Sequence, residues 1–230
     1  MTLPKSLFAP HIAHRGLWRP GGSPENSLSA FDAACKAGFG IELDVFLSAD
    51  GEAVVFHDDA LDRLTAESGL LEERTLEELQ AITLLGGDHQ HIPSLAEALG
   101  VIAGRSLVLI ELKTPDGQEG PLEVLTAELL GRYEGPAAVL SFNARALACM
   151  ARKSPETPRG INLDHAPGTE MLHQGQANFL SIDKGLANHA DVQSWRAKGG
   201  KAVTWTVRNA GEAARLSGAV DNILFEGFAP

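Results

Sequence analysis

The stretch GIELDVFLSADGEAVVFHD (residues 40–58) decides the fold, because it joins a buried strand to a hairpin-like excursion. Side chains of a strand alternate between its two faces, so Glu42 and Asp44 project together from an otherwise apolar segment. Asp50-Gly51 is a typical tight-turn pair and predicts the bend of the excursion.

Seven further short apolar runs predict strands, and most of them are followed by a helical stretch rich in Ala and Leu. Repeated βα units imply parallel strands, because parallel neighbours need a crossover connection. Eight such units predict a closed (β/α)8 TIM barrel. An open doubly wound sheet is the alternative, but no G-x-G-x-x-G follows the first strand. The seven runs are residues 11–14, 106–113, 137–142, 159–163, 179–183, 202–207 and 222–226.

The helical stretches carry recognisable start signals. Asn26 and Ser27 are cap candidates for the first stretch, and Ser94 with Glu97 has the spacing of a capping box. A short helical segment is also predicted near residues 169–175. The longer stretches are residues 26–38, 94–104, 123–133, 143–153, 191–199 and 209–218.

Residues 59–92 interrupt the alternation of strands and helices. They predict an insertion with one short helix, in which Thr75 and Glu78 have the spacing of a second capping box. In a barrel, an insertion after the carboxyl end of a strand lies on the active-site face. No repeat or linker divides the chain, so we expect residues 1–230 to form one domain with this small insertion after the second strand.

The composition narrows the classes of function. The 230 residues include 44% hydrophobic and 21% charged residues, and the net charge is −11. Nucleic-acid binders usually have the opposite sign, because Lys and Arg neutralise phosphates, and an acidic protein is repelled by anionic lipid. Two cysteines, Cys35 and Cys149, do not indicate a disulfide framework. The sequence has no apolar run of membrane-spanning length and no signal peptide, so we expect a cytoplasmic protein without stable membrane association.

Three acidic residues on two predicted strands indicate a metal site. The Glu42 and Asp44 pair alone is explained equally well by a solvated or salt-bridged strand face. Glu111 lies near the end of a second apolar strand, and a barrel gathers the carboxyl ends of its strands around one mouth. Three converging carboxylates favour a cation, and oxygen ligands favour Mg²⁺ or Ca²⁺ over Zn²⁺.

Two histidines also end predicted strands. His14 closes the first strand and His57 closes the excursion, and histidine exchanges protons near neutral pH. Arg15 offers a planar donor fork for phosphate oxygens, or else a salt bridge with an acidic neighbour. Lys113 offers a positive charge for the same phosphate, or an ion pair with one of the three acids. Trp205 either lines the barrel mouth or fills the core.

Several motifs resemble the glycerophosphodiester phosphodiesterase family, in the same order and at fitting distances. The resemblance is specific as far as residue 113 and is carried beyond it mainly by LSFN and TWTV. The motifs are IAHRG (12–16), SPENSLSAF (23–31), IELDVFLSADGEAVVFHD (41–58), IPSLAEAL (92–99), LIELK (109–113), LSFN (140–143) and TWTV (204–207).

The resemblance implies a TIM barrel with a divalent cation at its mouth. It implies acid and base roles for two residues and a metal-binding role for three. It also implies that two residues lie near the substrate phosphate. In that order these are His14 and His57; Glu42, Asp44 and Glu111; and Arg15 and Lys113.

Two positions depart from the family pattern. The family commonly has Asn directly after TWTV, whereas Arg208 stands there in this chain and Asn209 follows. The last strand of the family usually ends in a Thr-Asp-x-Pro-like pattern, whereas this chain has Glu226 and Gly227. Both changes leave the predicted catalytic residues intact and affect the expected identity of the substrate.

The expected activity is metal-dependent hydrolysis of a small glycerophosphodiester to an alcohol and glycerol 3-phosphate. Four alternatives stay open: the same chemistry on a lysophospholipid, the same chemistry on a sugar phosphodiester, a barrel lyase or aldolase, and a silent barrel that binds a phosphorylated metabolite. A lipid substrate calls for an apolar surface, and Leu70, Leu71, Leu84 and Leu85 of the insertion offer either that surface or a core. The sequence gives no sign of an oligomeric state.

Overall fold

A computed structural model describes residues 3–166 and 176–230, so the short segment predicted near 169–175 lies outside the described residues. In the two described ranges, eight parallel strands form a ring in which β1 pairs with both β2 and β9. The prediction of a closed (β/α)8 barrel is therefore confirmed, and the open sheet is wrong. The strands are β1 (Ile12–Ala13), β2 (Gly40–Leu47), β4 (Val108–Leu112), β5 (Ala137–Ser141), β6 (Arg159–Leu163), β7 (Phe179–Asp183), β8 (Ala202–Val207) and β9 (Asn222–Phe225).

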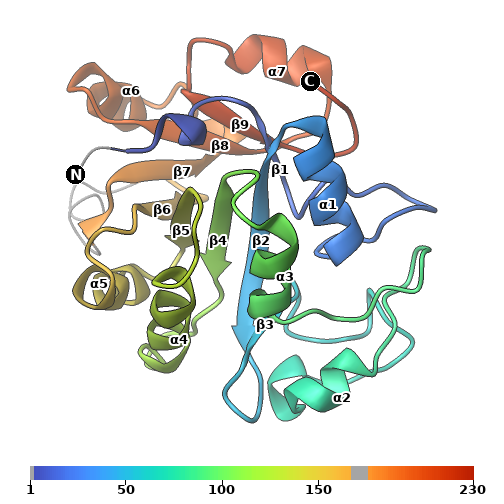
Figure 1. Ribbon diagram of the computed structural model, residues 1–230. Coiled ribbons are helices and arrows are strands. Elements are labelled where there is room, and N and C mark those ends of the chain that lie inside the picture. Colours follow the sequence, from blue (N-terminus) through green and yellow to red (C-terminus); the bar gives the residue numbers. More distant parts are fainter. Residues whose placement is uncertain (1–2, 167–175) are drawn as a thin grey trace.

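Helices surround this ring, as Figure 1 shows. Ser27 caps the first helix by accepting from the Ala30 amide, whereas the side chain of Asn26 donates to Asp44 instead. Ser94 and Glu97 form the predicted capping box. The helices are α1 (Leu28–Ala37), α2 (Leu76–Gln80), α3 (Leu95–Ile102), α4 (Pro121–Leu130), α5 (Ala144–Lys153), α6 (Ala190–Ala197) and α7 (Ala210–Leu216), with 3-10 turns η1 (Lys5–Leu7), η2 (Leu71–Glu73) and η4 (Lys184–Leu186).

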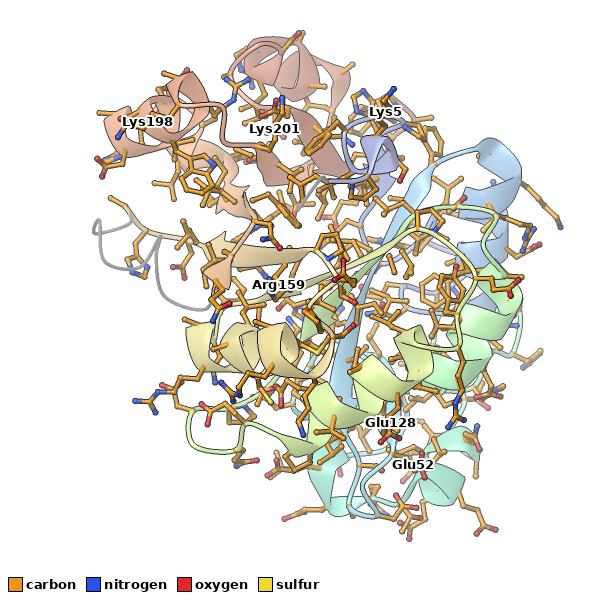
Figure 2. All side chains as sticks on the ribbon, turned by 60° about the vertical axis from the view of Figure 1, so that its left-hand side comes forward. Lys5, Glu52, Glu128, Arg159, Lys198 and Lys201 are labelled. Carbon is orange, nitrogen blue, oxygen red and sulfur yellow. The ribbon has the colours of Figure 1, made fainter. Side chains whose placement is uncertain are left out.

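The two faces of the strands build two separate cores. Outward residues such as Ile41 and Ile110 pack beneath the helices, while inward residues such as Leu109 and Phe179 fill the barrel. Leu7 of η1 belongs to the inner core and is fully buried, so η1 closes the end at which the strands begin. Figure 2 shows Lys5 of η1 near Lys201, at the start of β8. The mouth therefore opens at the other end.

The excursion after the second strand is the predicted hairpin. Strand β3 (Ala53–Val55) pairs antiparallel with β2, and Gly51 takes a φ of +83° at the turn. The hairpin and α2 lie together beyond the carboxyl end of β2 (Figure 1). Leu71 and Leu84 are buried in a small core of the insertion, whereas Leu70 and Leu85 are 41% and 51% exposed.

Candidate active site

Three carboxylates meet inside the barrel mouth. Glu42 and Asp44 point inward from β2, and Glu111 lies opposite Asp44 in the register of β2 and β4. One oxygen from each residue lies within 4.8 Å of the others, and all three side chains are buried. Oxygen ligands of this kind fit a hard divalent cation. We refer to these three residues as the carboxylate site.

The charges of the carboxylate site differ because their surroundings differ. Burial raises the pKa of Glu42 well above its usual value, and the negative charges of Asp44 and Glu111 raise it further. Burial also raises the pKa of Asp44, but the charges of Lys113 and Arg15 outweigh burial and hold that pKa at about 2. The excess of buried negative charge at Glu42 is what a bound cation would relieve.

Two cations contact the carboxylate site. Lys113 Nζ lies 3.0 Å from Asp44 Oδ1 and 2.6 Å from Glu111 Oε1. The Arg15 guanidinium lies 2.6 Å from Glu25 Oε1 and 3.5 Å from Asp44 Oδ2. Both of the ion-pair interpretations of Arg15 and Lys113 are thus observed. Both side chains also line the cavity at the barrel mouth.

The turn after β1 aims a backbone donor at the same site. Arg15 and Gly16 have φ values of +58° and +81°. In this left-handed turn the Arg15 amide donates to Glu42 Oε2 at 3.0 Å. A Cβ added at Gly16 would lie 2.9 Å from the Ala30 Cβ, so the turn packs tightly against α1. Glycine is required there by both its conformation and the space around it.

Each predicted catalytic histidine contacts a carboxylate through its Nδ1 nitrogen. His14 Nδ1 lies 2.9 Å from Glu226 Oε2, and its Nε2 lies 3.9 Å from Glu42 Oε2. His57 Nδ1 lies 2.5 Å from Asp58 Oδ1. Because an ionised carboxylate only accepts hydrogen bonds, Nδ1 carries the proton in both rings and Nε2 is left for other partners. Burial lowers the pKa of His57, which favours the neutral imidazole.

An arginine also forms an ion pair with each of these two carboxylates. Arg208 Nε donates to Glu226 Oε1 at 2.7 Å, and Arg63 Nε donates to Asp58 Oδ2 at 2.5 Å. Arg63 comes from the insertion and also contacts Glu25 through both terminal nitrogens. The two residues that depart from the family pattern, Arg208 and Glu226, are therefore partners in one ion pair behind His14.

Reasoning from the sequence did not assign a role to Glu226 or Asn162. Asn162 Nδ2 donates to Glu111 Oε2 at 3.0 Å. Both positions continue a period of two, since Glu226 lies two residues after the inward Leu224 and Asn162 lies two after Gly160, where an added Cβ would meet the inner core. By contrast, Arg63 carries no such signal, because it lies in the irregular insertion.

All eight predicted site residues line one cavity of about 160 Å³ at the barrel mouth. Trp205 forms part of the wall and packs edge-on against Phe142, with ring centroids 5.8 Å apart. A larger cavity of about 460 Å³ adjoins it, sharing Glu111, Lys113 and Phe142. The remaining lining residues of the smaller cavity are Leu140, Phe142, Asn162, Thr206 and Leu224, besides His14, Arg15, Glu42, Asp44, His57, Glu111, Lys113 and Trp205.

The profile of the glycerophosphoryl diester phosphodiesterase family matches residues 14–224. The chain belongs to this family. A glycerophosphodiester phosphodiesterase of Caldanaerobacter subterraneus is 33% identical over 226 residues, which cover 93% of this chain and 92% of that protein. YhdW of Bacillus subtilis is 35% identical over 229 residues, with 93% and 92% covered.

Solved structures agree with this assignment. A phosphodiesterase of Oleispira antarctica, in complex with the product sn-glycerol-3-phosphate, matches with a TM-score of 0.87 and 31% identity. The match covers 96% of this chain and 94% of that structure. A glycerophosphodiester phosphodiesterase of Parabacteroides distasonis matches with a TM-score of 0.80 and 26% identity, over 93% and 91% of the two chains.

These relationships identify the chain as a phosphoric diester hydrolase of the glycerophosphodiester phosphodiesterase family. The expectation of an enzyme acting on a small phosphodiester is confirmed at this level. In the described part of the chain, no helix combines the length and apolar character needed to cross a membrane.

Proposed function

We propose that this glycerophosphodiester phosphodiesterase releases an alcohol and glycerol 3-phosphate, using a divalent cation and two histidines. One observation carries the proposal. Three buried carboxylates and two histidines, each of which contacts a further carboxylate through Nδ1, line one small cavity. The product named for the Oleispira antarctica relative, sn-glycerol-3-phosphate, supports the same reaction for this chain.

The carboxylate site is proposed to hold the cation. Its three oxygen donors suit Mg²⁺ or Ca²⁺, and the raised pKa of Glu42 reflects a site built for more positive charge than Arg15 and Lys113 supply. When bound, such a cation polarises a phosphoryl oxygen and a coordinated hydroxyl. Mg²⁺ and Ca²⁺ remain alternatives, because carboxylate oxygens serve both.

Arg15 and Lys113 are proposed to hold the substrate phosphate. Burial lowers the pKa of Lys113, but the charges of Asp44 and Glu111 outweigh burial and raise it, so the ammonium stays charged. Arg15 Nε lies 3.5 Å from Asp44 Oδ2, the other oxygen of the carboxylate that Lys113 contacts. Two fixed cations beside the acids orient the phosphate and stabilise the charge that develops during the displacement.

His14 and His57 are proposed to move the protons. One Nε2 removes a proton from the attacking hydroxyl, and the other Nε2 gives a proton to the oxygen of the departing alcohol. If the glycerol 2-hydroxyl attacks, a cyclic phosphate forms and water opens it in a second step with the two roles exchanged. If water attacks directly, one step gives both products.

The proposal is tested by measuring both products from a panel of glycerophosphodiesters. After chelation we expect turnover to be lost, and we expect Mg²⁺ or Ca²⁺ to restore it. Equal release of alcohol and glycerol 3-phosphate excludes a lyase or an aldolase. Full activity after rigorous chelation would contradict the metal role. The panel includes a lysophospholipid and a sugar phosphodiester, the alternative substrates of the same chemistry.

The histidine roles are tested by single substitutions. We expect His14→Ala and His57→Ala each to lose most turnover while remaining folded, since general acid–base catalysis contributes about 10²–10⁴-fold. His165→Ala is the matched control, because His165 is an exposed histidine that contacts a neighbouring aspartate outside the cavity. Near-wild-type turnover of either cavity variant would remove that histidine from the mechanism.

A further inference from the structure

Arg63 of the insertion contacts two carboxylates at once. Its Nε and Nη2 donate to the two oxygens of Asp58 at 2.5 and 3.0 Å. Its Nη1 and Nη2 donate to the two oxygens of Glu25 at 3.1 and 2.8 Å. A guanidinium is planar and carries its five N–H donors in a fixed arrangement. One arginine can therefore fix the positions of two carboxylates relative to each other.

Each of these carboxylates also contacts a residue of the proposed mechanism. Asp58 Oδ1 lies 2.5 Å from His57 Nδ1, and Glu25 Oε1 accepts from Arg15 Nη1 at 2.6 Å. The same two oxygen atoms accept from Arg63 Nη2. The contacts form one continuous chain, which we call the ion network. Its members, in order of contact, are Arg15, Glu25, Arg63, Asp58 and His57.

The backbone that carries Arg63 is held by other contacts. Leu61, two residues earlier, is fully buried in the small core of the insertion. Thr65, two residues later, is also buried, and its hydroxyl donates to the Leu61 carbonyl at 2.9 Å. We therefore expect the insertion to fold without the guanidinium, and the Arg63 side chain extends to the ion network from a fixed support.

The burial of the ion network indicates a role in geometry rather than in stability. The Arg63 side chain is 47% exposed, and exposed ion pairs contribute little to stability. Glu25, by contrast, is buried, and among the described residues its Oε2 accepts only from Arg63. Burial raises the pKa of Glu25, but the hydrogen bond of Arg63 and the charge of Arg15 outweigh burial and lower that pKa. Without Arg63 this carboxylate would lose one of the two side chains that orient it.

We propose that Arg63 is a positioning residue for the reaction. It holds His57 through Asp58 and Arg15 through Glu25, so that the proton-transfer group and the phosphate-binding group keep a fixed relative position. Arg63 itself lines neither cavity at the barrel mouth. The insertion thus contributes to catalysis through the ion network. This inference rests on the proposed roles of His57 and Arg15 and goes beyond them by assigning a role to the insertion.

Arg63→Met tests the proposal, because methionine keeps much of the side-chain length but offers no donor. Displacement of a catalytic group by about 1 Å can cost roughly 100-fold in rate, so kcat on glycerophosphocholine at saturating Mg²⁺ or Ca²⁺ should fall by about 10- to 100-fold. The dissociation constant of sn-glycerol 3-phosphate, measured by calorimetry, should rise by about 10-fold, because Arg15 loses its fixed position as well. Arg63→Lys keeps the charge but not the fork, so it should recover only part of both losses.

Variants of the two branches distinguish positioning from a general loss of structure. Asp58→Asn interrupts only the branch to His57, so it should lower kcat and leave the affinity for sn-glycerol 3-phosphate near that of the wild type. Glu25→Gln interrupts only the branch to Arg15, so it should weaken this affinity. Arg63→Met should lower kcat less in the Asp58→Asn background than in the wild type, because both changes break the same branch.

Arg74→Met is the matched control. Arg74 follows η2 in the same insertion, and its charge acts on Glu78. The same chemical change is thus made outside the ion network. The kcat of this variant and its affinity for sn-glycerol 3-phosphate should equal those of the wild type, and both methionine variants should unfold at urea concentrations close to the wild-type midpoint.

The positioning role would be overturned if kcat and affinity of folded Arg63→Met lay within about twofold of those of Arg74→Met. It would also be overturned if the losses in kcat from Arg63→Met and Asp58→Asn simply multiplied in the double variant. Should Arg63→Met not fold, Arg63→Lys carries the test, and wild-type kcat and affinity in that variant would contradict the role. Each of these results leaves the phosphodiesterase function intact, whereas failure of the wild type to cleave any glycerophosphodiester with either metal would overturn the proposed function itself.

Discussion

Replacing Glu226 by glutamine tests whether the carboxylate behind His14 positions this histidine for proton transfer. Glutamine has nearly the same shape, but its amide carries no charge and offers a donor as well as an acceptor. The histidine would then lose the charged acceptor that favours its Nδ1–H tautomer and fixes its ring orientation. Substrate contacts are unaffected, since Glu226 does not line the cavity.

The expected magnitude follows from the contact. A hydrogen bond to a charged group contributes about 1.5–3 kcal/mol, and the His14–Glu226 contact is 2.9 Å long in a mostly buried setting. Each 1.36 kcal/mol changes a rate tenfold, so kcat should fall by about 10- to 150-fold. Arg208 is 59% exposed, and exposed pairs contribute about 0.2–1 kcal/mol, so Arg208→Gln should cost less than about 5-fold.

The assay is steady-state hydrolysis of a glycerophosphodiester at saturating metal, with kcat and KM determined separately. A positioning role lowers kcat and leaves KM nearly unchanged, and Glu226→Asp should retain more activity than Glu226→Gln. Glu212→Gln serves as the control, because Glu212 accepts from the Arg208 amide and from Lys184 but has no contact with His14. A kcat of Glu226→Gln within twofold of wild type, or a change confined to KM, would refute the reasoning.

Three further predictions concern stability. Burial raises the pKa of Glu226, but the hydrogen bond and charge of His14 outweigh burial and lower that pKa to about 2. The resulting stabilisation is present above the usual pKa of 4.5 and is lost as the pH falls towards 2. Between these pH values the denaturant midpoint of the wild type should therefore drop more than that of Glu226→Gln. Gly16→Ala should lower the free energy of unfolding by about 1–3 kcal/mol, because a φ of +81° disfavours a side chain that would also meet Ala30; a urea midpoint equal to wild type would contradict this. Arg159, labelled in Figure 2, is 5% exposed and donates to the Thr157 carbonyl at 2.7 Å. Arg159→Met should lower the free energy of unfolding by about 1–3 kcal/mol, because it leaves that carbonyl unpaired. Calorimetry should then show a lower Tm, while kcat stays unchanged.

The barrel was predictable because its strands are short, apolar and regularly spaced. All eight predicted parallel strands are present, and the capping boxes at Ser94 and Thr75 set the starts of α3 and α2. The shortest strand, β1, was predicted as four residues and has two. Asn26 was a cap candidate, but its side chain donates to Asp44 of β2, a contact that local patterns do not reveal.

The site was predictable where it continues the period of a strand. Asp44 lies two residues after Glu42, and Glu111 lies two after the inward Leu109. Their convergence follows from barrel closure. The partnership of Arg208 and Glu226 was not predictable, because these residues lie 18 positions apart on different loops. Arg63 was also missed, since the path of an irregular insertion depends on tertiary packing rather than on a repeating pattern.

The shortness of β1 has a further consequence. This two-residue strand is the seam of the ring, paired on one side with β2 and on the other with β9. The same seam carries His14, whose amide donates to the Phe225 carbonyl at 2.9 Å, one residue before Glu226. Opening the seam would separate the histidine from its carboxylate while the other strands stayed paired. Loss of activity should therefore precede global unfolding, and turnover would report whether the ring is closed.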